Sequence, residues 1–176
     1  AWLDDVLESV ALEPGANVSL PYNLPDDVAT ISRIPDALPD GLKSLAAWFD
    51  LADRAFRKLA ADHAGLNPGV RCWPHHFDIA TYVSLEAGDA ETAKGIGVGM
   101  SPGDESYGQP YFYVNPWPHL DPAKLPDAPT PGHWHTQGFV GAIATGDEIL
   151  SAPETKKALS GFLERAFDIG HRLLMR

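Results

Sequence analysis

Two segments of the chain carry histidines whose spacing suits a binding site. In residues 133–143, His133, His135 and Gln137 occupy every second position. We predict one long strand here, and because alternate side chains of a strand point the same way, these three should share a face. That face continues into Phe139 and Ile143, while the opposite face carries Trp134, Thr136, Val140 and Ala142. A polar start and an apolar end suit the rim and floor of a pocket.

The second segment, residues 73–78, adds two histidines and a carboxylate. His76 and Asp78 are two positions apart, so they too should share a strand face. Imidazoles and carboxylates are ligands for zinc, iron and manganese. One hypothesis is therefore a divalent metal such as zinc, held by His76, Asp78, His133 and His135. The alternative is that these histidines hydrogen-bond to backbone or tyrosine hydroxyls, because no established metal spacing such as HExxH is present.

Four predicted strands position these groups, at residues 77–85, 95–100, 111–115 and 133–143. Alternation within the first three separates apolar core positions from a second face. The core positions are Phe77, Ile79, Val83, Leu85, Ile96, Val98 and Met100. The second face carries His76, Asp78, Tyr82, Ser84, Tyr111 and Tyr113, with Gly95, Gly97 and Gly99 leaving room among them. Turn-rich connections favour antiparallel neighbours, so we expect a meander.

Two long helices are predicted around these strands. Asp40 suits the N-cap of the first, whose apolar positions from Leu42 to Leu59 recur at three and four. The last helix should begin at a capping box formed by Ser151 and Glu154. A helix at residues 1–10 and a short edge strand at residues 17–20 are also expected. Because the first helix lacks a starting Met or cap, we expect the chain to be the C-terminal part of a longer one.

These elements predict a single α+β domain over residues 1–176, with an antiparallel sheet of about four strands and helices on one face. The other face should form a ligand pocket. Its predicted ligand-binding residues are His76, Asp78, Tyr82, Tyr111, Tyr113, His133, His135 and Gln137.

Composition excludes several classes of partner. The net charge of −11 disfavours nucleic acid and anionic membranes, both of which attract basic surfaces. There is no signal peptide and no apolar run long enough to span a bilayer. Cys72 is the only cysteine, so no disulfide forms within the chain. We therefore expect a cytoplasmic protein.

Residues 99–103 match the hydrolase pattern G-x-S-x-G, but two features argue against acyl transfer. Pro102 follows the serine and lacks the N–H that an oxyanion hole requires, and no helix is predicted after it. Residues 95–99 are no dinucleotide loop either, because Met100 stands where the third glycine belongs.

The chain resembles an uncharacterised bacterial family, a domain of unknown function. The resemblance rests on residues 71–80 (RCWPHHFDIA), on residues 97–104 (GVGMSPGD) running into residues 110–113, and on residues 132–136 (GHWHT). It implies that members carry an additional N-terminal region. Because the family has no assigned activity, the resemblance implies the sheet and no catalytic residues.

The leading functional hypothesis is a small-molecule-binding protein that uses the polar sheet face, with or without a divalent metal. One alternative is a structural or interaction module, whose polar face meets a missing N-terminal region or a second subunit of a homo-oligomer. Another is a metal-dependent hydrolase with Asp78 as the base. Whether the chain is an enzyme stays open from its sequence.

Overall fold

The computed structural model describes residues 40–63, 69–74, 76–88 and 92–176, and the structural statements below concern these residues. They belong to the compact unit Pro39–Arg176, one of two units into which the chain divides. The helix predicted at residues 1–10 and the edge strand predicted at residues 17–20 lie outside the described residues.

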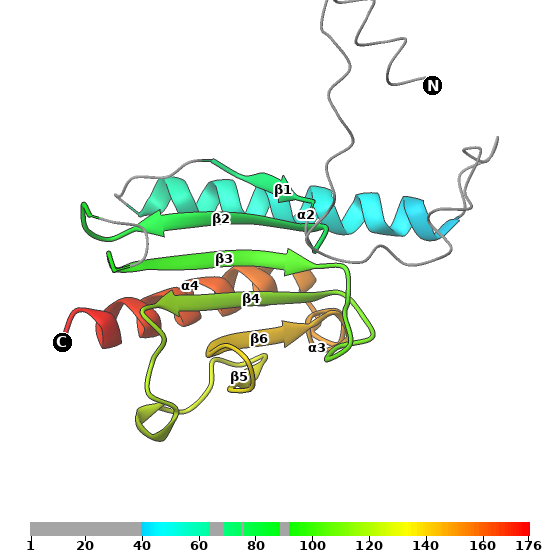
Figure 1. Ribbon diagram of the computed structural model, residues 1–176. Coiled ribbons are helices and arrows are strands. Elements are labelled where there is room, and N and C mark those ends of the chain that lie inside the picture. The colour runs from blue at the N-terminus through cyan, green and yellow to red at the C-terminus, as the bar shows by residue number, and fades with distance from the viewer. Residues whose placement is uncertain (1–39, 64–68, 75, 89–91) are drawn as a thin grey trace, which may run out of the picture. The chain divides into compact units, whose positions relative to one another are not determined.

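The described unit is built on an antiparallel sheet (Figure 1). Its strands are β1 (Arg71–Trp73), β2 (Asp78–Ser84), β3 (Gly95–Ser101), β4 (Tyr111–Trp117), β5 (His133–His135) and β6 (Gly141–Thr145). They lie in the order β1-β2-β3-β4-β6-β5. The α+β class and the antiparallel sheet are thus confirmed, but the sheet has six strands where about four were predicted.

The long strand predicted at residues 133–143 is a hairpin. β5 pairs with β6 in antiparallel fashion, with His133 opposite Ile143 and His135 opposite Gly141. The connection contains Gly138 at a φ of 83°, which favours glycine and lets the chain reverse. Paired residues share a face, so His133 still lies on the same face as Ile143. Trp134 packs against the hydrophobic core on the other side.

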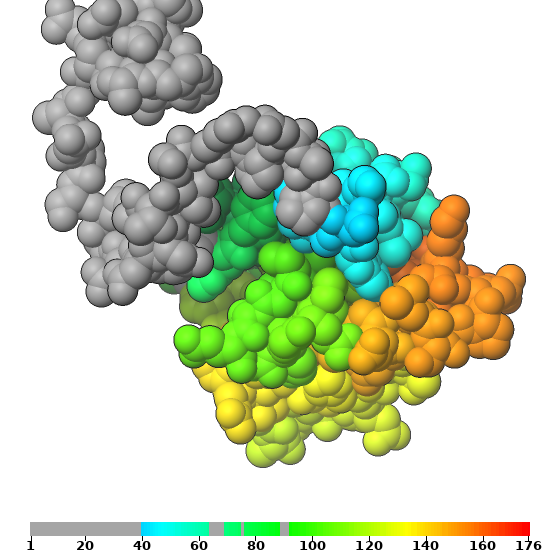
Figure 2. Space-filling model, turned by 90° about the vertical axis from the view of Figure 1, so that its right-hand side faces the viewer, coloured from blue at the N-terminus to red at the C-terminus, as the bar shows by residue number. Residues whose placement is uncertain are grey.

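Two long helices, α2 (Asp40–Asp62) and α4 (Thr155–Leu174), cover one face of the sheet (Figure 1). Figure 2 shows the two layers from one end, with cyan and orange helices on one side and green and yellow strands on the other. Between the layers the core is apolar. It includes Ile79, Val83, Ile96, Val98, Met100, Phe112 and Val114 from the strands and Phe56, Leu59, Phe162 and Phe167 from the helices. Core positions predicted by alternation are confirmed, except that Phe77 lies exposed before β2 and Leu85 is only partly buried against the core.

The capping box lies at another place than predicted. Thr145 Oγ1 accepts a hydrogen bond from the N–H of Glu148, and the Glu148 carboxylate accepts one from the N–H of Thr145, at the start of α3 (Gly146–Leu150). Ser151 instead ends α3, where its N–H bonds to the carbonyl of Asp147. The prediction of a Ser151–Glu154 box was therefore wrong, because the earlier T-x-x-E match begins a helix first. A short 3-10 helix, η2 (Pro122–Lys124), lies between β4 and β5.

Glycines shape the sheet face away from the helices. A side chain at Gly95 would overlap the ring of Tyr82, one at Gly97 would overlap Asn115, and one at Gly99 would overlap Tyr113. Glycine on β3 thus lets side chains from its two neighbouring strands lie flat against the backbone. None of the described helices is long and apolar enough to cross a membrane.

Candidate functional site

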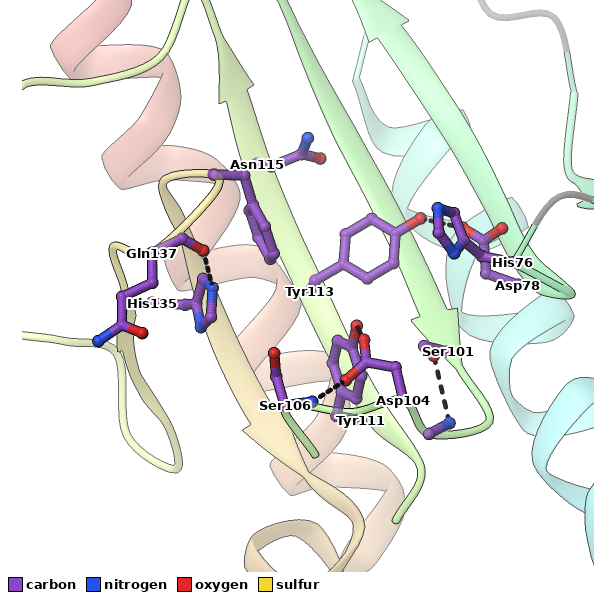
Figure 3. Close-up of a pocket in the computed structure, with 12 residues that line it drawn as sticks. His76, Asp78, Ser101, Asp104, Ser106, Tyr111, Tyr113, Asn115, His135 and Gln137 are labelled. Atoms are coloured by element: carbon purple, nitrogen blue, oxygen red, sulfur yellow. Dashed lines mark hydrogen bonds between the residues drawn. The ribbon is translucent and has the colours of Figure 1, made fainter. Parts of the chain in front are cut away.

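A pocket of about 430 Å³ opens on the glycine-bearing face of the sheet (Figure 3). Its lining comes from β2 and the segment just before it, from the end of β3 and the β3–β4 connection, from β4, and from the β5–β6 hairpin. The lining residues are His76, Asp78, Ser101, Gly103, Asp104, Ser106, Tyr111, Tyr113, Asn115, His135, Gln137 and Phe139. Some of the side chains that alternation assigned to the second face, namely His76, Asp78, Tyr111 and Tyr113, thus line this hollow.

Most of the predicted ligand-binding residues line the pocket, namely His76, Asp78, Tyr111, Tyr113, His135 and Gln137. The other two do not. Tyr82 lies farther along β2, where its ring covers Gly95. His133 faces Tyr107 and Glu148, with Nε2 3.1 Å from the Tyr107 hydroxyl and Nδ1 3.5 Å from Glu148 Oε1.

Sequence reasoning missed the end of β3 and the turn that follows it, which supply Ser101, Gly103, Asp104 and Ser106. Asp104 organises this turn, because its Oδ1 accepts hydrogen bonds from the N–H groups of Ser106 and Tyr107 at 2.8 and 3.0 Å. The available signal was the turn-forming run at residues 101–104, directly between two strands that carry the polar face. Asn115 and Phe139 were missed as ligand contacts although both lie on the predicted face.

Asp78 and Tyr113 form a pair across the sheet. The Tyr113 hydroxyl donates a hydrogen bond to Asp78 Oδ2. Burial raises the pKa of Tyr113, and the hydrogen bond and negative charge of Asp78 raise it further. Tyr113 therefore stays protonated at neutral pH, and its proton is directed to the carboxylate.

A second aspartate–tyrosine pair lies beside the first. The Tyr111 hydroxyl donates to Asp104 Oδ2 at 2.6 Å. Burial raises the pKa of Tyr111, and Asp104 adds to the shift. For Asp104, burial acts to raise the pKa, but hydrogen bonds from Tyr111, Tyr107 and Ser106 together lower it below its ordinary value. Asp104 is therefore ionised at neutral pH.

His135 is fixed through both ring nitrogens. Its Nε2 lies 2.5 Å from the carbonyl oxygen of Gln137, and its Nδ1 lies 2.9 Å from the Tyr107 hydroxyl. A carbonyl only accepts, so Nε2 carries the proton, and in the neutral ring Nδ1 accepts from Tyr107. The Tyr107 oxygen is then left to accept from His133 Nε2. A chain of hydrogen bonds thus connects His135 in the pocket wall, through Tyr107, to His133.

The four predicted metal ligands do not converge. In Figure 3, His76 and Asp78 lie at one side of the Tyr113 ring and His135 at the other. Across the described part of the chain, no group of three or more His, Cys, Asp or Glu side chains is placed to hold a metal ion. The hydroxyl and backbone partners of His133 and His135 instead match the alternative predicted for them.

The fold and site together define an α+β protein with helices on one sheet face and a polar, aromatic pocket on the other. Comparison with protein-family models, with curated proteins and with solved structures finds no match for the chain. Function must therefore be argued from the pocket itself.

Proposed function

We propose that this chain is a small-molecule-binding protein whose ligand lies on the polar sheet face between Asp78 and His135. The observation that carries the proposal is the pocket of about 430 Å³, into which side chains from separate strands converge. Ligand pockets usually enclose about 300–1,000 Å³ and combine apolar surface with a few placed polar groups. The tyrosine and phenylalanine rings supply the first here, and the aspartates, amides and His135 supply the second.

The fixed positions of the pocket side chains also support the binding of a small molecule. Tyr113 is held by Asp78, Tyr111 by Asp104, and His135 by Tyr107 and the Gln137 carbonyl. Side chains fixed before a ligand arrives lose little conformational freedom on binding, which favours affinity.

A variant that fills the pocket tests the proposal. Ser106 lines the pocket and is exposed, so Ser106→Trp should occupy the hollow without disturbing the core. Ser151→Trp is the matched control, because Ser151 is exposed at the end of α3 and does not line the pocket. A fragment library is screened by ¹⁵N-resolved NMR against all three proteins. Fragments that bind the wild type and Ser151→Trp should lose binding to Ser106→Trp. Equal binding to both variants, or no binding near the pocket, contradicts the proposal.

The hypotheses of a bound divalent metal and of a metal-dependent hydrolase gain no support from the geometry of the described residues. Asp78 as a hydrolytic base would need a metal-bound water beside it, and the described histidines and carboxylates stand in separate groups. Elemental analysis of the purified protein tests this directly. A stoichiometric metal that is lost in a His133→Ala/His135→Ala variant would restore the metal hypothesis.

An interaction module is the second candidate, and a different region favours it. β1 lies at one edge of the sheet with all its residues exposed, and Trp73 and Phe77 are 49% and 52% exposed. An exposed edge strand with large apolar side chains is a template for pairing with another chain. Sedimentation over a range of concentrations tests self-association. A dimer that dissociates in Trp73→Ser supports this role, and a monomer at every concentration contradicts pairing of two copies.

A further inference from the structure

We infer that the pocket takes an organic cation, an ammonium or guanidinium compound with N–H groups to donate. This inference rests on the proposed function and names the chemical class of its ligand. It follows from the charges, the proton positions and the aromatic rings of the lining residues, which are three separate observations.

The first observation is charge. Asp78 and Asp104 both line the pocket, and none of its described lining residues is Lys or Arg. Each carboxylate accepts a tyrosine hydroxyl through one oxygen. A carboxylate offers about four lone-pair positions over two oxygens. Asp104 also accepts the N–H groups of Ser106 and Tyr107, so its remaining acceptor capacity for a donating ligand is smaller than that of Asp78. An anionic ligand would lose its hydration beside two negative charges.

The second observation is where the hydroxyl protons go. Tyr113 donates to Asp78, and Tyr111 donates to Asp104. A tyrosine hydroxyl has one proton, so these oxygens have only lone pairs left to offer. His135 in turn spends its Nε2–H on the Gln137 carbonyl. The fixed groups therefore present acceptors, which a ligand rich in N–H donors satisfies.

The third observation is the arrangement of rings. The Tyr111 and Tyr113 rings have centroids 6.3 Å apart, and His135 stacks on Phe139 at 4.5 Å. A cation within about 6 Å of an aromatic ring is attracted by the negative face of the ring. Tyrosine and phenylalanine faces beside the aspartate side chains thus complement an organic cation in both charge and shape.

Matched fragments that differ in charge test the inference. On one phenylethyl skeleton we would compare 2-phenylethylammonium, 2-phenylethanol and 3-phenylpropanoate, and on one butyl skeleton butylguanidinium, butanol and pentanoate. Binding is followed at pH 7 by ¹⁵N-resolved NMR of residues 101–107 and 135–139. We expect the cations to bind about tenfold or more tightly than their neutral and anionic counterparts. Their advantage should shrink as salt is added.

Two charge-neutralising variants locate the effect. Asp104→Asn keeps the side-chain shape and should reduce the preference for cations about tenfold. Asp168→Asn is the control, because it removes the same charge from an exposed position on α4. Should Asp104→Asn fold poorly in a thermal melt, Asp78→Asn replaces it.

If the neutral or anionic fragments bind as tightly as the cations, the proposed ligand class is wrong, while the proposal of a binding pocket still stands. If no fragment perturbs these residues, the proposed function itself fails. If Asp168→Asn lowers the preference as much as Asp104→Asn, the effect comes from net charge and the inference is overturned.

Discussion

The two faces of the sheet are made by alternate residues of the same strands, yet different forces hold them. On β4, Phe112 and Val114 are buried under the helices, whereas Tyr111 and Tyr113 hydrogen-bond to aspartates on the pocket side. Burying a large apolar side chain contributes about 1.5–3 kcal/mol, and a hydrogen bond contributes about 0.5–1.5 kcal/mol. Most of the folding stability should therefore come from the helix face. Side chains on the pocket face can then be suited to binding a ligand rather than to holding the fold together.

The largest expected change in stability distinguishes the helix face of the sheet from the pocket face. Phe112 is 0% exposed and meets the rings of Trp48 and Phe56 from α2, so Phe112→Ala should lower the free energy of unfolding by about 3–5 kcal/mol. Phe139→Ala, in the partly exposed pocket wall, should cost about 1 kcal/mol or less. Urea unfolding of both variants measures the difference. Similar losses would mean that the pocket face carries as much of the fold as the core.

Gly99→Ala tests whether the faces are independent. The added methyl group would overlap the Tyr113 ring, so the ring must move and Asp78 loses its hydrogen bond. We expect a loss of about 1–3 kcal/mol in unfolding free energy, together with loss of fragment binding. Gly108→Ala is the control, since nothing lies within 4 Å of a side chain there. A Gly99→Ala variant that binds fragments normally would show that the Tyr113 position does not define the pocket.

Alternation explains why so much of this division was predictable. The period of two along residues 77–85, 95–100 and 111–115 depends only on the local pattern, and it assigned Ile79, Val98 and Tyr113 to the faces that they occupy. The same alternation is the reason that the β5–β6 hairpin was predicted as one long strand. Residues on either arm of β5–β6 alternate in the same way, so the pattern alone does not show the reversal at Gly138.

Hydrogen bonds between residues that are far apart in the chain could not be predicted from the sequence. Tyr107 lies in a turn, and nothing local indicates that its hydroxyl reaches His133 and His135, which are 26 and 28 positions away. Asp104 belongs to the same turn, and its position alone does not indicate that it also accepts a hydrogen bond from Tyr111 in the pocket. The position of a loop side chain depends on how the strands on either side of the loop pack. The periodicity of the sequence carries no information about that packing.

The smallest expected effect concerns the charge of Asp104. Its pKa in the folded chain is below the ordinary value of 3.8 because of the hydrogen bonds that it accepts. An aspartate with a lowered folded pKa stabilises the fold fully above the unfolded value, and this contribution is lost as the pH falls through the folded pKa. Asp104 is exposed, so Asp104→Asn at pH 7 should lower the unfolding free energy by less than about 1 kcal/mol.

The pH dependence distinguishes this charge from a loss of shape. The difference between wild type and Asp104→Asn should be constant from pH 7 to about pH 5, then shrink as the pH falls below the ordinary value of 3.8 and through the lowered folded pKa, where the wild-type carboxylate is protonated. Urea unfolding at each pH measures it. In a Tyr111→Phe background, Asp104 accepts one hydrogen bond fewer, so the same substitution should have a smaller effect. A difference that is unchanged or grows on acidification would mean that Asp104 acts through the geometry of its turn, and the case for a negatively charged pocket would then rest on Asp78 alone.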